Sequence, residues 1–251
     1  TIKVRASSGN QVSQSELKVE VRNPNPSITL VASQTVLPGK SVAMDVLPVG
    51  APSKSTAMLE ISAVPPLQLK KRLGYLIQYP HGCIEQTTSS VFPQLYLSAL
   101  TDLDAAQLQK LENNVKAAIT RLKSFQTSDG GFSYWPGMST ADDWGSNYAG
   151  HFLLEAKSRG YLVPDDLLTP WLNYTKSKAE KWSIGANSPS FYVDEITQAY
   201  RLYLLSLAGR PSLGAMNRLK EFKNLGDETK WRLAFAYQKS GYPRQASSLI
   251  S

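Results

Sequence analysis

Residues 79–89 read YPHGCIEQTTS, and they lie where the sequence changes from a β pattern to an α pattern. Pro80 and Gly82 interrupt the helical spacing of apolar residues before them, because neither residue continues a helix well. The helical spacing resumes at Val91. Cys83, the only cysteine in the chain, is therefore predicted at or just before the start of a helix.

Gln86 follows Cys83 by three positions, and side chains with that spacing are neighbours in a helical turn, with Cβ atoms about 5 to 6 Å apart. At this distance the cysteine sulfur can condense with the side-chain carbonyl carbon of the glutamine and expel ammonia. The product is an internal thioester, an acyl group that is activated toward nucleophiles. Cys83 and Gln86 are therefore the candidate reactive pair.

From residue 1 to about residue 64, apolar and polar residues alternate with a period of two. The alternation is clearest at 2–5, 17–22, 42–46 and 57–63, and breaks rich in Ser, Gly, Asn and Pro separate these runs. Short alternating runs with turn residues between them predict an antiparallel β region. The Asn-Pro-Asn-Pro tract at 23–26 predicts a linker, because a residue before proline is restricted to extended conformations.

After Pro65 and Pro66 the apolar spacing becomes helical. Amphipathic helical faces recur at 69–77, 115–122, 149–156, 196–204 and 233–237. Glycines are expected to end helices at Gly160, Gly209, Gly226 and Gly241. The fold class is therefore predicted as α+β and multidomain, with antiparallel β segments followed by successive helical hairpins.

One loop refines the helical prediction. Residues 126–135 read QTSDGGFSYW and resemble the turns of α/α-toroid proteins such as the triterpene cyclases. Glycines permit a tight reversal of the chain, and we expect Phe132 and Trp135 to pack between adjacent hairpins. The loop therefore favours an α/α toroid.

Composition excludes several classes of function. The net charge is +7, but the basic residues are scattered among acids and only residues 70–72 form a tight cluster, so no nucleic-acid partner is predicted. No apolar run is long enough to span a membrane, and no secretory signal opens the chain. A single cysteine excludes an internal disulfide and a multi-cysteine zinc site, and no metal or cofactor is predicted.

The segment around Cys83 resembles the thioester motif of the alpha-2-macroglobulin and complement family, Gly-Cys-x-Glu-Gln. Gly82, Cys83, Glu85 and Gln86 match it residue for residue, and Ile84 replaces the glycine that is usual in vertebrate members. The longer form, Tyr-Pro-x-Gly-Cys-x-Glu-Gln-Thr-Thr-Ser, is similar to the bacterial branch and is complete here. Tyr79 and His81 belong to this longer motif and are expected to support the site.

The resemblance implies a domain organisation. Residues 1–26 would be the last strands of a macroglobulin-like β-domain, and residues 27–66 the first part of a CUB β-sandwich. Residues 67–251 would be the thioester-containing α/α toroid. A complete toroid needs more helices, and the returning CUB strands are missing, so we expect a fragment of a much larger protein of the bacterial periplasm or cell envelope.

The resemblance also implies a function that is not enzymatic turnover. A protease cleaves a bait region elsewhere in the parent protein, and the rearrangement exposes the thioester. A lysine amine of the protease attacks the acyl carbon of Gln86, and thiolate leaves from Cys83. The implied partners are proteases, captured covalently in a single event, and the remaining domains of the parent protein.

Aromatic and apolar groups should shield the thioester from water, because an exposed one would hydrolyse. The candidates for this shield are Tyr79, Tyr134, Trp135 and Tyr192. Complement-type members carry a catalytic histidine downstream, but the comparable stretch here, residues 188–195, contains none. His151 is interpreted as structural, so we expect direct attack by amines, with His81 as a group that could sense pH or assist.

Three alternatives stay open. Cys83 could be the nucleophile of a hydrolase or acyltransferase with His81 or His151 as its base, although this leaves Glu85 and Gln86 unexplained. Cys83 could also be buried and inert.

The third alternative is a carbohydrate-active or cyclase-like toroid with an acid/base pair at Asp142-Asp143 or Asp194-Glu195. Acidic pairs at helix starts usually stabilise the helix dipole, which favours the structural interpretation.

Overall fold

The structure is a computed structural model that describes residues 1–19, 28–50, 55–59, 61, 73, 75–183 and 191–250, with only the backbone of 191–193. It divides into two compact units, Thr1–Pro66 and Leu67–Ser251. Each unit is described by itself.

The first unit contains one β-hairpin. Strands β1 (Ile2–Ser8) and β2 (Gln11–Leu17) pair antiparallel, with Ile2 opposite Leu17 and Ser8 opposite Gln11. The two residues between the strands include Gly9, whose φ of 56° is the left-handed conformation that two-residue hairpin turns require. This hairpin confirms the predicted antiparallel pairing at the start of the chain.

The strand expected at 42–46 does not form a β-ladder in the described part of the unit. Residues 28–50 and 55–59 are neither helical nor paired, and the apolar side chains of 42–46 are exposed. The alternating pattern supplies an apolar face, but a strand also needs a neighbour to complete its hydrogen bonds. No described segment of this unit provides that neighbour.

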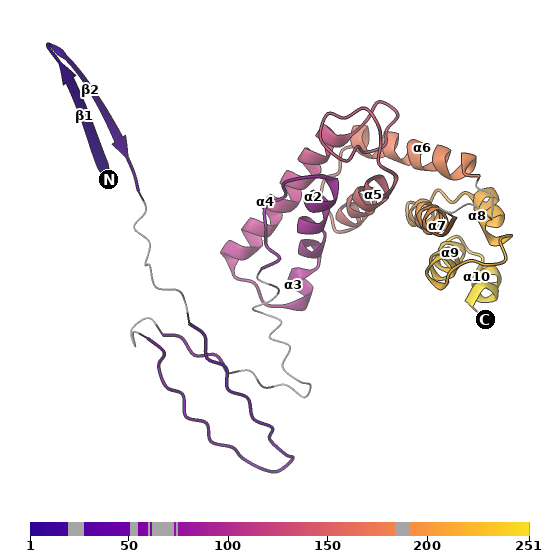
Figure 1. The fold of residues 1–251 in the computed structure, drawn as a ribbon. Coiled ribbons are helices and arrows are strands. Elements are labelled where there is room, and N and C mark those ends of the chain that lie inside the picture. Colours follow the sequence, from indigo (N-terminus) through magenta and orange to yellow (C-terminus); the bar gives the residue numbers. More distant parts are fainter. Residues whose placement is uncertain are drawn as a thin grey trace. The chain divides into compact units, whose positions relative to one another are not determined.

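The second unit is built from helices (Figure 1). Their bounds are α2 (Ile84–Val91), η2 (Pro93–Leu95), α3 (Leu97–Leu100), α4 (Ala105–Leu122), η3 (Lys123–Phe125), α5 (Asp143–Ser158), α6 (Asp165–Lys181), α7 (Phe191–Leu207), α8 (Leu213–Lys220), α9 (Asp227–Lys239) and α10 (Pro243–Ile250). The predicted fold class, antiparallel strands followed by helices of an α/α toroid, is confirmed.

Local sequence explains most helix ends. Asp104 caps α4 by accepting from the Gln107 N–H at 2.8 Å, and Asp142 caps α5 by accepting from the Gly145 N–H at 2.6 Å. Gly160, Gly209 and Gly241 follow helix ends with positive φ, as predicted. The prediction for Gly226 is wrong. This glycine is the N-cap of α9, where its extended backbone starts the helix.

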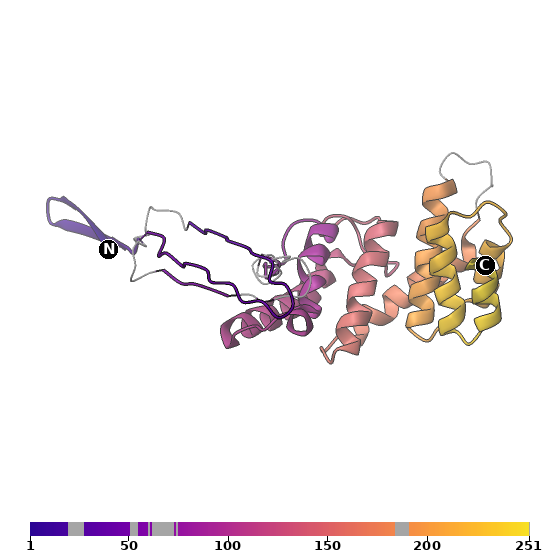
Figure 2. The same cartoon turned by 90° about the horizontal axis from the view of Figure 1, so that it is seen from below.

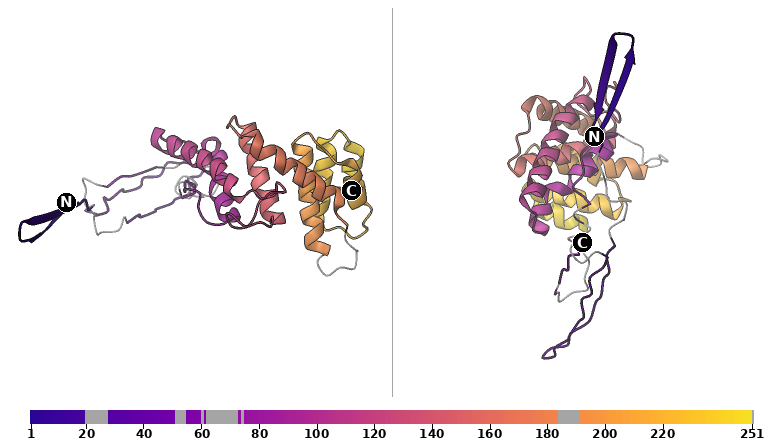
Figure 3. Two further views of the ribbon diagram at one scale, coloured as in Figure 1. Left: turned by 90° about the horizontal axis from the view of Figure 1, so that it is seen from above. Right: turned by 90° about the vertical axis from the view of Figure 1, so that its left-hand side faces the viewer.

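Two apolar cores hold the second unit together. The first lies among α2, α4, α5 and α6, where the predicted faces at 115–122 and 149–156 are buried, and Figure 3 shows α4 and α5 within this group. The second lies among α7, α8, α9 and α10, together with Ala179 of α6. Helices α7, α9 and α10 lie side by side (Figure 2). Helix α7 contributes to both cores, with Tyr200 and Leu204 in the first and Leu202 and Leu205 in the second.

Helix α6 was not predicted, and the predicted helix at 69–77 lies mostly outside the described residues. Pro170 lies inside α6 and weakens its sequence pattern, because proline lacks the N–H that the helix uses. Among the described helices, none is long and apolar enough to cross a membrane. In the same part of the chain, no group of acidic, histidine or cysteine side chains is arranged to hold a metal ion.

Candidate functional site

Cys83 is the N-cap residue of α2, with an extended backbone at φ −71° and ψ 177°. Its side chain is buried, with an exposed fraction of 4%. The Gln86 side chain turns back over the same helix end, and its Oε1 accepts a hydrogen bond from the Cys83 N–H at 3.1 Å. The predicted helix start therefore brings the sulfur and the glutamine amide together at one helix end.

Gly82 leaves the space that the Gln86 side chain occupies. It has a φ of +83°, and a Cβ placed there would lie 2.0 Å from Gln86 Oε1 and 2.9 Å from Gln86 Cδ. Any other residue would therefore combine a strained backbone with a clash against the Gln86 side chain. The glycine of the motif has two separate physical reasons to be a glycine.

Arg121 of α4 holds the turn before Cys83. Its Nη2 donates to the Gly82 carbonyl at 3.0 Å, and its Nε donates to Thr87 Oγ1 at 3.3 Å. Thr87 is buried and donates in turn to the His81 carbonyl at 3.3 Å. Sequence reasoning missed Arg121, because nothing near residue 121 shows that α4 crosses the start of α2.

Tyr134 lies against the same helix end. Its carbonyl accepts from the Ile84 N–H at 3.0 Å, and its hydroxyl donates to Glu85 Oε2 at 3.4 Å. The neighbouring side chains of Cys83 and Glu85 raise the pKa of Tyr134 to about 12. Tyr134 is therefore brought together with Cys83 and Glu85.

The loop at 126–135 positions Tyr134, but only part of the prediction for it is confirmed. Phe132 is fully buried in the first core, as expected, and a Cβ on Gly130 would lie 2.4 Å from the Pro170 carbonyl oxygen. The expectation that Trp135 packs between hairpins is wrong, because 49% of its surface is exposed. The chain turns outward after Ser133, whose Oγ bonds back to the carbonyls of Phe125 and Trp135.

The other predicted residues are spread around this centre. Tyr79 has an exposed fraction of 63%, and His81 is also exposed. Tyr134 itself is 39% exposed, so its ring is partly open to solvent. The side chain of Tyr192 lies outside the described residues. A shielding role for these aromatic residues stays a prediction.

His151 takes part in a separate cluster. Its Nδ1 lies 2.9 Å from the Tyr200 hydroxyl, and its ring packs edge-on against Phe92. Burial is the main cause that lowers the pKa of His151 to about 4; the charge of Glu155 opposes this shift and that of Arg232 adds to it. Cys83 is not among the described contacts of His151, so the structure favours the structural interpretation of this histidine.

Asp142, Asp143 and Glu195 of the two acidic pairs also have structural contacts. Asp142 caps α5, and Asp143 pairs with Arg201 at 2.9 Å and Lys178 at 3.3 Å. Burial alone would raise the pKa of Asp143, but the two cations lower it overall. Glu195 is buried and accepts from the Gly226 N–H at 2.9 Å. These contacts argue against Asp142-Asp143 as an acid/base pair.

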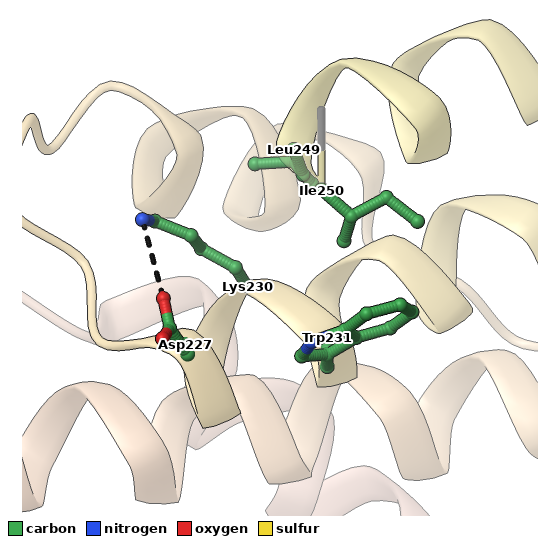
Figure 4. Close-up of a pocket in the computed structure, with 5 residues that line it drawn as sticks. All are labelled: Asp227, Lys230, Trp231, Leu249 and Ile250. Atoms are coloured by element: carbon green, nitrogen blue, oxygen red, sulfur yellow. Dashed lines mark ion pairs between the residues drawn. The ribbon is translucent and has the colours of Figure 1, made fainter.

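A shallow pocket lies elsewhere, on α9 and α10 (Figure 4). Its lining residues are Asp227, Lys230, Trp231, Leu249 and Ile250, and Lys230 pairs with Asp227 at 3.6 Å. None of these residues belongs to the elements that hold Cys83. The pocket is therefore not part of the candidate site.

Comparisons with known proteins give one consistent result. Residues 56–180 match the family described as the A-macroglobulin TED domain. The alpha-2-macroglobulin of Escherichia coli K12 is 29% identical over 220 residues, which cover 82% of this chain and 13% of that protein. The alpha-2-macroglobulin of Xylella fastidiosa Temecula1 is 32% identical over 178 residues, which cover 67% of this chain and 11% of that protein.

Solved structures agree. The native conformation of E. coli alpha-2-macroglobulin superposes with a TM-score of 0.62 at 27% identity, over 74% of this chain and 12% of that one. Salmonella alpha-2-macroglobulin reacted with methylamine gives a TM-score of 0.61 at 27% identity, over 74% of this chain and 13% of that one. The chain thus spans only a small part of the length of these relatives.

Proposed function

Because this chain belongs to the alpha-2-macroglobulin family, we propose that Cys83 and Gln86 form an internal thioester that captures proteases covalently. The observation that carries the proposal is the pairing of Gln86 Oε1 with the Cys83 N–H at 3.1 Å beside a buried cysteine. Gly82 supports the proposal, because it leaves room for the glutamine acyl group, whereas a larger residue at position 82 would occupy that space.

The chemistry follows from this arrangement. An amine of the protease attacks the acyl carbon of Gln86, the C–S bond breaks, and an amide joins the two proteins. A hydrogen bond from the Cys83 N–H to the acyl oxygen would stabilise the negative charge that develops there. The chain is consumed in one event, so the role is that of a protease trap rather than an enzyme. Lysine side chains are the attacking amines in this proposal.

The same proposal covers the domains of this chain and the location of the parent protein. Residues 1–26 belong to a macroglobulin-like domain, 27–66 to a CUB domain and 67–251 to the thioester domain. The parent acts in the periplasm or cell envelope of a bacterium. The treatment of related proteins with a protease or with methylamine supports these partners. E. coli alpha-2-macroglobulin was solved after activation by trypsin, and the Salmonella protein after reaction with methylamine.

Intact mass spectrometry with and without methylamine, together with thiol titration, tests the thioester. We expect the untreated protein to weigh one ammonia less than its sequence and to show no free thiol. Methylamine should add one molecule and release one thiol, and the Cys83→Ala variant should do neither. If the full-length parent has the unmodified mass and a free thiol from the outset, the trap proposal fails and a cysteine nucleophile becomes the leading alternative.

A further inference from the structure

Tyr134 is fixed beside Cys83 by its backbone as well as by its side chain. Its carbonyl accepts from the N–H of Ile84, the first residue of α2, at 3.0 Å. Ile84 is fully buried, and a Cβ on Gly145 would lie 2.5 Å from Ile84 Cγ2, so α2 and α5 are in close contact there. These contacts hold the Tyr134 backbone in a fixed position beside the first turn of α2.

The Tyr134 hydroxyl faces two acceptors and has one proton to donate. Glu85 Oε2 lies at 3.4 Å, which is long for an O–H···O bond, so the carboxylate binds this proton weakly. The second is the Cys83 sulfur, at the N-cap position directly before Ile84, whose N–H donates to the Tyr134 carbonyl. Sulfur in a thiol or thioether is a weak acceptor, whereas a thiolate carries a full negative charge.

The hydroxyl remains a donor throughout the physiological pH range. The contact with Cys83 and the nearby negative charges raise the pKa of Tyr134 to about 12, so the phenol stays protonated. It therefore cannot serve as a general base for an incoming amine. Its available role is to stabilise negative charge that appears next to it.

We propose that Tyr134 is a catalytic residue of thioester opening, whose hydroxyl donates a hydrogen bond to the Cys83 sulfur as the thiolate leaves. This inference rests on the proposed thioester. The amine nitrogen forms a bond to the Gln86 acyl carbon, the C–S bond breaks, and its electron pair leaves on sulfur. The surplus proton of the nitrogen passes to water, and the Tyr134 proton stays on its own oxygen.

A donor and a shield predict different results when the hydroxyl is removed. Tyr134→Phe keeps the aromatic ring, so a residue that only excludes water should be unaffected. If the hydroxyl stabilises the leaving thiolate, the thioester should react more slowly with amines once the hydroxyl is gone. Loss of one charge-assisted hydrogen bond at a partly exposed site is expected to slow aminolysis about 10-fold.

Tyr148→Phe is the matched control. Tyr148 lies on α5 and its hydroxyl accepts from Ser89 Oγ of α2 at 3.3 Å, so its removal also deletes one phenol next to α2. Its hydrogen bond goes to Ser89 and not to the sulfur. We expect Tyr148→Phe to react with methylamine at the wild-type rate.

The experiment measures thiol release by methylamine from the full-length parent, with wild type, Tyr134→Phe and Tyr148→Phe side by side. A second measurement follows the rate at which iodoacetamide alkylates the released Cys83 as a function of pH. This pH profile should shift to higher pH in Tyr134→Phe only. A loss of thiolate stabilisation moves this profile, whereas a change in packing alone does not.

A wild-type thioester with an unchanged or faster rate in Tyr134→Phe overturns the role of Tyr134 alone. A wild-type protein that has no mass deficit and releases no thiol refutes the thioester itself, and the role of Tyr134 with it. Mass spectrometry before treatment separates these two outcomes.

Discussion

Replacement of Gly82 by alanine should abolish the thioester while leaving the fold intact. The new Cβ would lie 2.0 Å from Gln86 Oε1, whereas an ordinary contact between carbon and oxygen is about 3.3 Å. The Gln86 amide therefore has to retreat by more than about 1 Å. A displacement of that size can slow a reaction between positioned groups by about 100-fold, which is enough to prevent condensation with Cys83.

Backbone strain has to be separated from this clash, and Gly160→Ala provides the comparison. Gly160 has a φ of +88°, close to the +83° of Gly82, but a Cβ placed there meets nothing within 4 Å. Both substitutions place an L-residue in the left-handed region, at a cost of about 1 to 2 kcal/mol each. Only Gly82→Ala also displaces the acyl group.

Mass spectrometry and thermal unfolding of the two variants of the parent protein provide the assay. Both should unfold at a similarly reduced temperature. Gly160→Ala should keep the mass deficit of one ammonia and the hidden thiol, whereas Gly82→Ala should have the full sequence mass and a free thiol. Retention of the deficit in Gly82→Ala would show that the reactive geometry does not depend on this space, and the reasoning about the Gln86 contact would be wrong.

Three further predictions concern the surroundings of the site. The pKa of His151 is about 4 in the fold and about 6.5 when unfolded, so between these values only the unfolded state binds this proton. Acidification from pH 6.5 to 4 should therefore lower the free energy of unfolding by about 2 to 3 kcal/mol. Urea titrations should show a smaller loss in the His151→Phe variant. In Gly150→Ala the new Cβ would lie 1.9 Å from the Trp171 indole, so the free energy of unfolding should fall by about 1 to 3 kcal/mol, whereas the helical control Gly214→Ala, with open space, should be neutral or slightly stabilising in the same titration. Arg121→Met removes the donor to the Gly82 carbonyl, and methylamine should then release the thiol at a changed rate, with an unchanged rate arguing that the turn holds itself.

Local sequence predicted the features that depend on local structure. The apolar face at 149–156 became the buried side of α5, and the helix start at Cys83 followed from the interruption by Pro80 and Gly82. Each of these depends on backbone conformation within a few residues. The prediction that Cys83 and Gln86 lie close together succeeded for the same reason, because it depends only on the backbone of one helical turn.

Features that depend on packing between distant segments were not predicted. Arg121 contacts the Gly82 carbonyl across 39 positions, and this contact requires the crossing of α4 and α2. Trp135 is an apolar residue whose exposure depends on the outward turn after Ser133. Pro170 is locally unfavourable for α6, because proline cannot donate a helical hydrogen bond. Burial of Trp171 and the neighbouring leucines outweighs the loss of this one hydrogen bond.

Helix α7 makes the two cores of the second unit dependent on each other. Tyr200 and Leu204 point to one core and Leu202 and Leu205 to the other, so neither core can open without exposing one face of this helix. In native-state hydrogen exchange, cooperative units open separately when little apolar contact joins them. The amides of α7 should therefore exchange among the slowest in the unit. A disturbance at the far end, around α9 and α10, should reach Cys83 through α7 and through α6, which also contributes residues to both cores.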